Sequence, residues 1–144
     1  MKFQDMISQI KSSDDKWEQQ GMTCFVLQVP NSGHWDGYVI SDKQIDNVNE
    51  IRVHGGITFE LREGNRFMYG FDTVHYMDTL ENRPREWVIE ETKCLANEIQ
   101  SYVQRGRLVL NFENLEQMNK FTTMLRDLNI SYEIRDNEWF VKVL

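Results

Sequence analysis

Two short motifs in the middle of the chain gather most of its unusual polar side chains. The first is His54-Gly55-Gly56-Ile57-Thr58, and the second is segment 70–78, Gly-Phe-Asp-Thr-Val-His-Tyr-Met-Asp. The second motif places Asp72, His75 and Asp78 at three-residue steps. Histidines grouped with carboxylates are typical of sites that bind a metal, move a proton or hold a polar ligand.

If the segment after residue 71 is irregular, these side chains can converge with His54 and with Glu91 from a later helix. Two imidazoles and several carboxylates suit zinc, manganese or iron. One hypothesis is therefore a metal-dependent hydrolase, in which His54, Asp72 and His75 bind a divalent metal and Glu91 is the general base. In a structural alternative, Asp72 and Asp78 cap turns and His75 is a core residue. A third alternative is a metal-free ligand pocket.

The glycine pair has two interpretations of its own. Exposed glycine N–H groups can form a nest for a phosphate or carboxylate, whereas Gly-Gly is also a common hairpin turn. No Lys-Ser/Thr follows, so the motif is not a Walker loop. Across the hypotheses, the predicted ligand-binding residues are His54, Gly55, Gly56, Asp72, His75, Asp78, Glu91 and Arg52.

Composition narrows the classes of function. The chain has 144 residues, of which 40% are hydrophobic and 27% charged, as in ordinary globular proteins. Its formal net charge of −7 argues against general nucleic-acid binding and against contact with anionic membranes. No apolar run is long enough for a membrane span and no signal-peptide pattern opens the chain, so we expect a cytoplasmic location.

Hydrophobic spacing predicts an α+β fold, an antiparallel sheet packed by one main helix. Apolar residues at helical spacing predict an N-terminal helical segment over 3–20, within a segment 1–21 that ends at Gly21. The core region 22–106 then carries the sheet and a helix over 87–104, whose apolar face includes Glu91. Gly37 inside a strand predicts a bulge or a close approach to the backbone. Strands are predicted at 23–29, 35–40, 51–53, 57–61 and 66–71, with a hairpin turn at 63–65.

The last forty residues, 107–144, predict a β-α-β-β extension. Asn114 is the expected N-cap of its helix, and Asp136-Asn137 is the expected turn of its hairpin. No Pro-, Gly- or Ser-rich linker separates this extension from the rest, so residues 1–144 are predicted to form a single compact domain.

The motifs also resemble those of a family of small, mostly uncharacterised bacteriophage proteins. The family pattern has a Trp-x-Gly-Tyr-Val strand, a His-Gly-Gly-Leu-Thr turn and a Gly-Phe-Asp-x-x-His-x-x-Asp segment. Here these are Trp35–Val39, 54–58 and 70–78, and the likeness covers residues 23–100. The extension 107–144 departs from the pattern. The resemblance implies a phage origin, the cytoplasm of an infected host cell and a shared site, but no particular reaction.

Three functions therefore stay open at the level of the sequence. The first is a polar pocket that binds a small ligand or a host protein, in counter-defence against the host. The second is the metal-dependent hydrolase. The third is a protein-interaction module or homodimer, whose contact patch is Trp139-Phe140 or the N-terminal helix.

Overall fold

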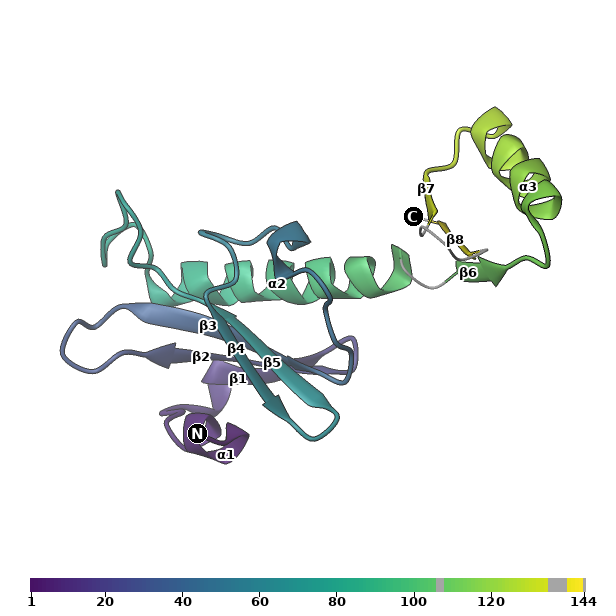
Figure 1. Ribbon diagram of the computed structural model, residues 1–144. Coiled ribbons are helices and arrows are strands. Elements are labelled where there is room, and N and C mark those ends of the chain that lie inside the picture. Colours follow the sequence, from purple (N-terminus) through teal and green to yellow (C-terminus); the bar gives the residue numbers. More distant parts are fainter. Residues whose placement is uncertain (106–107, 135–139, 144) are drawn as a thin grey trace. The chain divides into compact units, whose positions relative to one another are not determined.

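The structure, a computed structural model, describes residues 1–105, 108–134 and 140–143 (Figure 1). The chain divides into two compact units, the N-terminal unit Met1–Gln100 and the C-terminal unit Ser101–Leu144. This differs from the single compact domain that the sequence predicts. The boundary lies inside helix α2 (Arg85–Arg105), so the chain crosses it as helix and not as a flexible linker. The prediction is wrong because it took the absence of such a linker as evidence for one domain.

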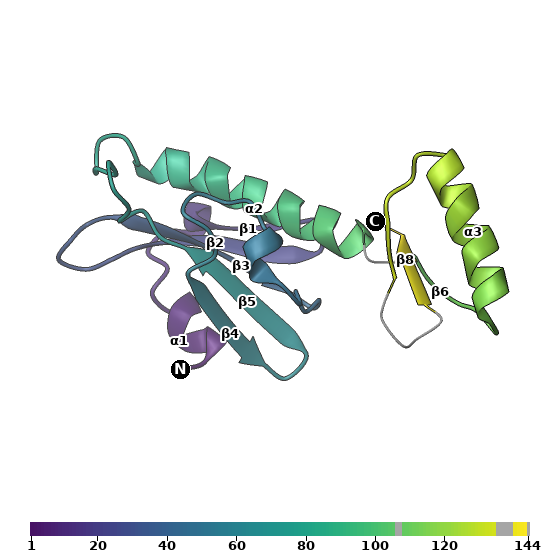
Figure 2. The same cartoon turned by 45° about the horizontal axis from the view of Figure 1, so that its top comes forward.

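The N-terminal unit is built on a five-stranded antiparallel sheet in the order β1-β2-β3-β5-β4. Helix α2 runs across one face of the sheet, and the short helix α1 (Phe3–Ile7) lies at the other (Figures 1 and 2). The α+β prediction, with an antiparallel sheet packed by one main helix, is confirmed. The strands are β1 (Lys16–Gln19), β2 (Met22–Gln28), β3 (Trp35–Ser41), β4 (Phe59–Glu63) and β5 (Arg66–Phe71).

Strand alternation gives the sheet two buried faces. On the α1 face, the apolar cluster consists of Phe3, Met6, Phe25, Leu27, Tyr38, Ile40 and Met68. On the other face, α2 buries Val88, Leu95 and Ile99. A Cβ at Gly37 would overlap Thr92 Oγ1 of α2 and the Phe71 ring. The close approach predicted at Gly37 is thus present, and it is made by the helix.

The N-terminal segment is helical only in part. After α1 comes a 3₁₀ turn at Ser13–Asp15, and residues 16–19 form β1 rather than helix. Gln19 pairs with Met22 across a two-residue turn, whose Gln20 and Gly21 have φ of 52° and 76°. The helix predicted over 3–20 is therefore wrong for residues 16–19, because backbone pairing with β2 outweighs the helical spacing of Trp17.

The strand predicted at 51–53 is also wrong. These residues belong to a loop that contains a 3₁₀ turn at Val48–Glu50, and β4 begins only at Phe59. The sheet, in the order β1-β2-β3-β5-β4, does not include residues 51–53, and the positive φ of Gly55 and Gly56 turns the chain before β4 begins. Gly55-Gly56 is accordingly a turn within a loop, closed by Gly56 N–H donating to the Val53 carbonyl at 2.8 Å.

The C-terminal unit has the predicted β-α-β-β order. It contains β6 (Leu108–Asn111), α3 (Leu115–Asp127), β7 (Tyr132–Ile134) and β8 (Phe140–Val143), and β8 is the central strand of its antiparallel sheet. The predicted N-cap is confirmed, because Asn114 Oδ1 accepts a hydrogen bond from Gln117 N–H at 2.9 Å. The turn predicted at Asp136-Asn137 and the proposed contact residue Trp139 lie outside the described residues.

We expect Gln20→Asn to stabilise the N-terminal unit. Glutamine at positive φ carries strain that asparagine tolerates better, and Asn-Gly favours this two-residue hairpin turn, so the gain should reach about 1 kcal/mol. Urea unfolding measures it, with Gln44→Asn as the control, because Gln44 is exposed and is not at positive φ. An unchanged or lower stability in Gln20→Asn would contradict the hairpin.

Candidate functional site

The side chain of Asp78 is the centre of the polar cluster, and only 1% of it is exposed. Its Oδ2 lies 2.8 Å from His54 Nε2 and accepts the backbone N–H of His75 at 3.0 Å. Its Oδ1 accepts a hydrogen bond from Arg83 Nε at 3.0 Å. We call these four residues, Asp78, His54, His75 and Arg83, the Asp78 cluster. A carboxylate removed from water needs such partners to remain charged.

Electrostatics keep Asp78 ionised. Burial is the largest single effect and by itself raises the pKa of this carboxyl. The hydrogen bonds from His54 and from the His75 backbone, together with Arg83, outweigh burial and hold the pKa of Asp78 below its usual range. Asp78 is therefore a fixed negative charge at neutral pH and is not a proton donor.

His54 is held from two sides. Its backbone N–H donates to Glu91 Oε1 of α2 at 2.8 Å, and its ring packs edge-on against Trp87 at a centroid distance of 5.1 Å. Because a carboxylate only accepts, the contact with Asp78 assigns the proton to Nε2 and leaves Nδ1 as the acceptor of the neutral ring. Glu91 thus lies beside His54, as the sequence predicts, and its carboxylate accepts the backbone N–H of that residue.

His75 lies over the glycine turn. A Cβ at Gly55 would overlap the His75 imidazole, so only glycine fits beneath the ring. His75 Nε2 is 3.1 Å from Asp72 Oδ1 but lacks hydrogen-bond geometry, whereas the same Asp72 oxygen accepts Val74 N–H at 3.1 Å. Asp72 thus caps the turn after β5, as the structural alternative predicts.

A second polar group consists of two carboxyls, Asp36 in β3 and Asp72 directly after β5. Burial is the main cause that raises the pKa of Asp36 to about 6, and Asp72 raises it further. His34, 3.4 Å away, lowers it, as do hydrogen bonds from the Thr73 backbone and from Tyr38. Asp36 and Asp72 therefore repel each other when both are charged.

The predicted metal ligands do not form a metal-binding group. Across residues 1–105, 108–134 and 140–143, no three His, Cys, Asp or Glu side chains are arranged to hold a metal ion. His54 Nε2 faces Asp78, while His75 Nε2 faces Asp72. The set His54, Asp72 and His75 is thus divided between two separate histidine–carboxylate pairs.

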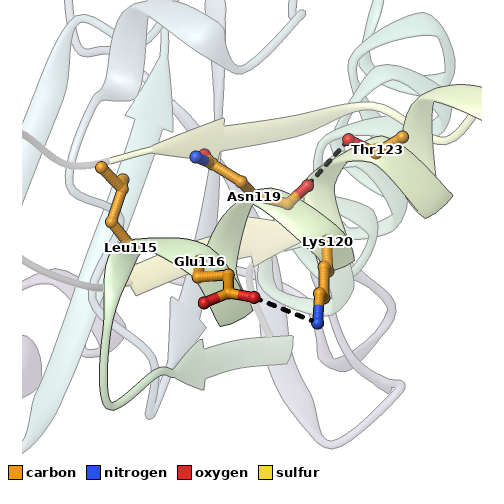
Figure 3. A pocket seen from close by; sticks show the side chains of 5 residues that line it. All are labelled: Leu115, Glu116, Asn119, Lys120 and Thr123. Carbon is orange, nitrogen blue, oxygen red and sulfur yellow. Dashed lines mark hydrogen bonds and ion pairs between the residues drawn. The ribbon is translucent and has the colours of Figure 1, made fainter.

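The cluster also does not line either pocket that the structure describes. A pocket of about 690 Å³ lies on α3, where the lining side chains Glu116 and Lys120 pair with each other at 3.4 Å (Figure 3). Thr123 Oγ1 in the same lining donates to the Asn119 carbonyl at 2.8 Å. A smaller pocket of about 280 Å³ is lined by residues from 44–45, β4 and β5. None of the predicted ligand-binding residues lines either pocket.

Sequence reasoning placed three members of the cluster but missed the fourth, Arg83, and the Trp87 ring that packs against it. Arg83 and Trp87 were not predicted, although the Arg83 guanidinium stacks over the Trp87 ring at 4.3 Å from its centroid. Their spacing of four residues across Pro84 was the available signal. Arg52 is exposed, with no described hydrogen bond or ion pair to the cluster, and Gly56 has open space around it.

The cluster fixes a loop that we call the 72–83 loop. Thr73 Oγ1 donates to the Trp35 carbonyl at 2.8 Å, which ties the loop to β3. Within the loop, Asn82 exchanges hydrogen bonds with Thr79 and donates to the Met77 carbonyl at 2.9 Å. The loop is therefore ordered by polar contacts at its base and within its own turn.

Four large apolar side chains of this loop are exposed to solvent. The exposed fractions are 95% for Tyr76, 71% for Met77, 62% for Val74 and 56% for Leu80. We call these four side chains the loop patch. Leu80 adjoins the turn between β2 and β3, since a Cβ at Gly33 would lie 3.8 Å from its Cδ1. By contrast, α1 buries Phe3 and Met6, so the N-terminal helix is not the free contact patch that the sequence suggests.

Comparisons with protein-family models, curated proteins and solved structures found no match to this chain. The resemblance to phage proteins stays a prediction from the motifs. Among the described residues, no helix is both long and apolar enough to cross a membrane.

Replacement of Asp78 by alanine should destabilise the N-terminal unit by about 3 kcal/mol, since it leaves Arg83 and His54 without their buried partner. The pKa of Asp78 is lower in the folded than in the unfolded state, so its contribution to the free energy of unfolding is complete above the pKa of an unfolded aspartate. It is lost as the pH falls through the lowered value. Urea unfolding at several pH values should show that the free energies of unfolding of the unchanged chain and of Asp78→Ala converge in acid. Asp46→Ala, at an exposed position, is the control, and an equal loss there would contradict the role of Asp78.

The two glycines of the motif form a matched pair for a second test. Both have positive φ, 69° at Gly55 and 80° at Gly56, so alanine strains the backbone at either position. Only Gly55→Ala also displaces the His75 ring, which should add about 1–3 kcal/mol of destabilisation. Equal unfolding midpoints for the two variants would show that His75 does not depend on Gly55.

Proposed function

We propose that this protein binds another protein through the loop patch, and that the Asp78 cluster positions the patch. The observation that carries the proposal is the exposure of four large apolar side chains on one ordered loop, with Tyr76 at 95%. Isolated exposed apolar residues are common, but four within the short segment from Val74 to Leu80 favour an interaction site. Tyrosine and methionine are also enriched at interfaces.

The order of the loop favours binding. An interface segment that is already fixed loses less conformational entropy when a partner binds. Here the base is fixed by Asp78 and by the contact of Thr73 with β3, while Asn82 closes the tip. The partner would therefore meet a preformed surface.

The backbone at Met77 supports the same proposal. Met77 has φ 73°, a left-handed conformation that costs a non-glycine residue about 1–2 kcal/mol. Its side chain is 71% exposed, so burial of the side chain does not offset that strain. Residues in sparsely populated backbone conformations cluster at ligand-binding sites and switch regions.

A small-molecule pocket at the same residues has less support. The polar atoms of Asp78 are directed to His54, His75 and Arg83, and Glu91 binds a backbone N–H. Groups that already satisfy one another offer few free donors or acceptors to a ligand. The histidine and carboxylate motifs thus explain the shape of the loop better than they explain a reaction.

A photocrosslinking residue at position 76, in the cells that produce the protein, tests the proposal. We expect discrete adducts with a second protein from position 76 and none from the same residue at position 90, an exposed site on α2. The adducts should be lost when Met77→Asn and Leu80→Ser are added. Met77→Asn relieves the positive φ, so it should keep the unit folded while it removes an apolar contact.

Three results would contradict the proposal. One is equal crosslinking from positions 76 and 90, another is no adduct from either, and the third is an adduct that survives Met77→Asn with Leu80→Ser. Circular dichroism of each variant provides the folding control.

A further inference from the structure

We propose that the partner segment bound by the loop patch is basic as well as apolar, with lysine or arginine side chains beside the residues that cover Tyr76 and Met77. This inference rests on the proposed function and adds the chemistry of the partner. It is carried by the charges that surround the patch, which are acidic and incompletely compensated.

The segment 72–86 carries four acidic and two basic residues. Both arginines are already engaged. Arg83 binds the buried carboxylate of Asp78 at 3.0 Å, and Arg85 binds the buried carboxylate of Asp15 at 2.6 Å. Each guanidinium thus has a buried carboxylate as its nearest partner, and the exposed acids of the segment are compensated at most by the longer contact of Arg85 with Glu86.

The remaining acids lack strong cationic partners. Glu81 lies beside Leu80, is exposed and forms no ion pair within the described part of the chain. Glu86 has a 76% exposed side chain and only a 3.6 Å contact with Arg85, which Asp15 already occupies. Exposed acids beside apolar side chains favour a partner of opposite charge, because complementary rims guide association and reject wrong partners.

The start of the loop adds to this negative field. Asp72 has the imidazole of His75 at 3.1 Å, and Asp36 has that of His34 at 3.4 Å. Neither carboxylate has a lysine or arginine as an ion-pair partner among the described residues. Their mutual repulsion would be reduced by a cationic group from a partner.

A second copy of this chain fits the patch less well. A symmetric contact would place the same acidic segment of each copy opposite itself. Each chain also carries a net charge of −7, which opposes self-association. A different, basic partner is therefore the occupant that the charges favour.

Selection of short displayed random peptides on the full chain tests the inference. Peptides are counter-selected on the Tyr76→Ser/Met77→Asn variant, so that only binders dependent on the patch remain. We expect the enriched peptides to combine apolar residues with a net positive charge above that of the unselected library. The affinity of one enriched peptide should fall about two- to fivefold in Glu81→Gln, the usual effect of an exposed charge pair. Glu60→Gln, an exposed position on β4, should leave it unchanged.

The outcomes separate the two proposals. Enriched peptides that depend on the patch but are neutral or acidic would overturn the basic partner and keep the loop as a binding site. Equal loss of affinity in Glu81→Gln and Glu60→Gln would also overturn it, since the attraction would then come from the net charge alone. Failure to enrich any peptide dependent on Tyr76 and Met77 would contradict the proposed function itself. A crosslinked dimer of the chain from position 76 would replace the basic partner with a second copy.

Discussion

The buried carboxylate of Asp78 is the interaction on which the middle of the chain depends. Through its two oxygens it joins the loop that carries His54, the backbone at His75 and the guanidinium of Arg83 just before α2. None of these partners is held in place by the sheet ladder. A charge with 1% exposure needs such partners, so Asp78 links the three segments to one another, in addition to the contacts of His54 with α2 and of Thr73 with β3.

This constraint changes the role of the motif residues. Histidines and aspartates at such spacing suggest catalysis, yet here Asp78 binds His54, the His75 backbone and Arg83 and so holds a loop. The side chain of His75 packs on Gly55, and its Nε2 has no hydrogen-bond partner within the described part of the chain. The loop exposes four large apolar side chains, those of Val74, Tyr76, Met77 and Leu80. Buried polar contacts therefore supply the order of the loop, which its exposed apolar residues cannot supply.

Much of the fold follows from local patterns. The apolar run of β2, the helix α2 and the capped helix after Asn114 have strong periodicity or caps, and the structure has all three. The errors occur where local spacing was weak and pairing decided the outcome. Residues 16–19 became a strand because they pair with β2, whereas Ile51–Val53 stayed a loop because the positive φ of Gly55 and Gly56 turns the chain before it joins the sheet at β4.

By itself, the sequence determined the class of fold, the order of the elements in the C-terminal unit and the region in which the polar residues gather. These depend on periodicity, turn residues and caps, which act over a few residues. Only the tertiary structure decided that Asp78 binds His54 and Arg83, that His75 rests on Gly55, and that the patch faces solvent. Such partnerships depend on the paths of loops between distant positions, and no local spacing encodes where two loops meet.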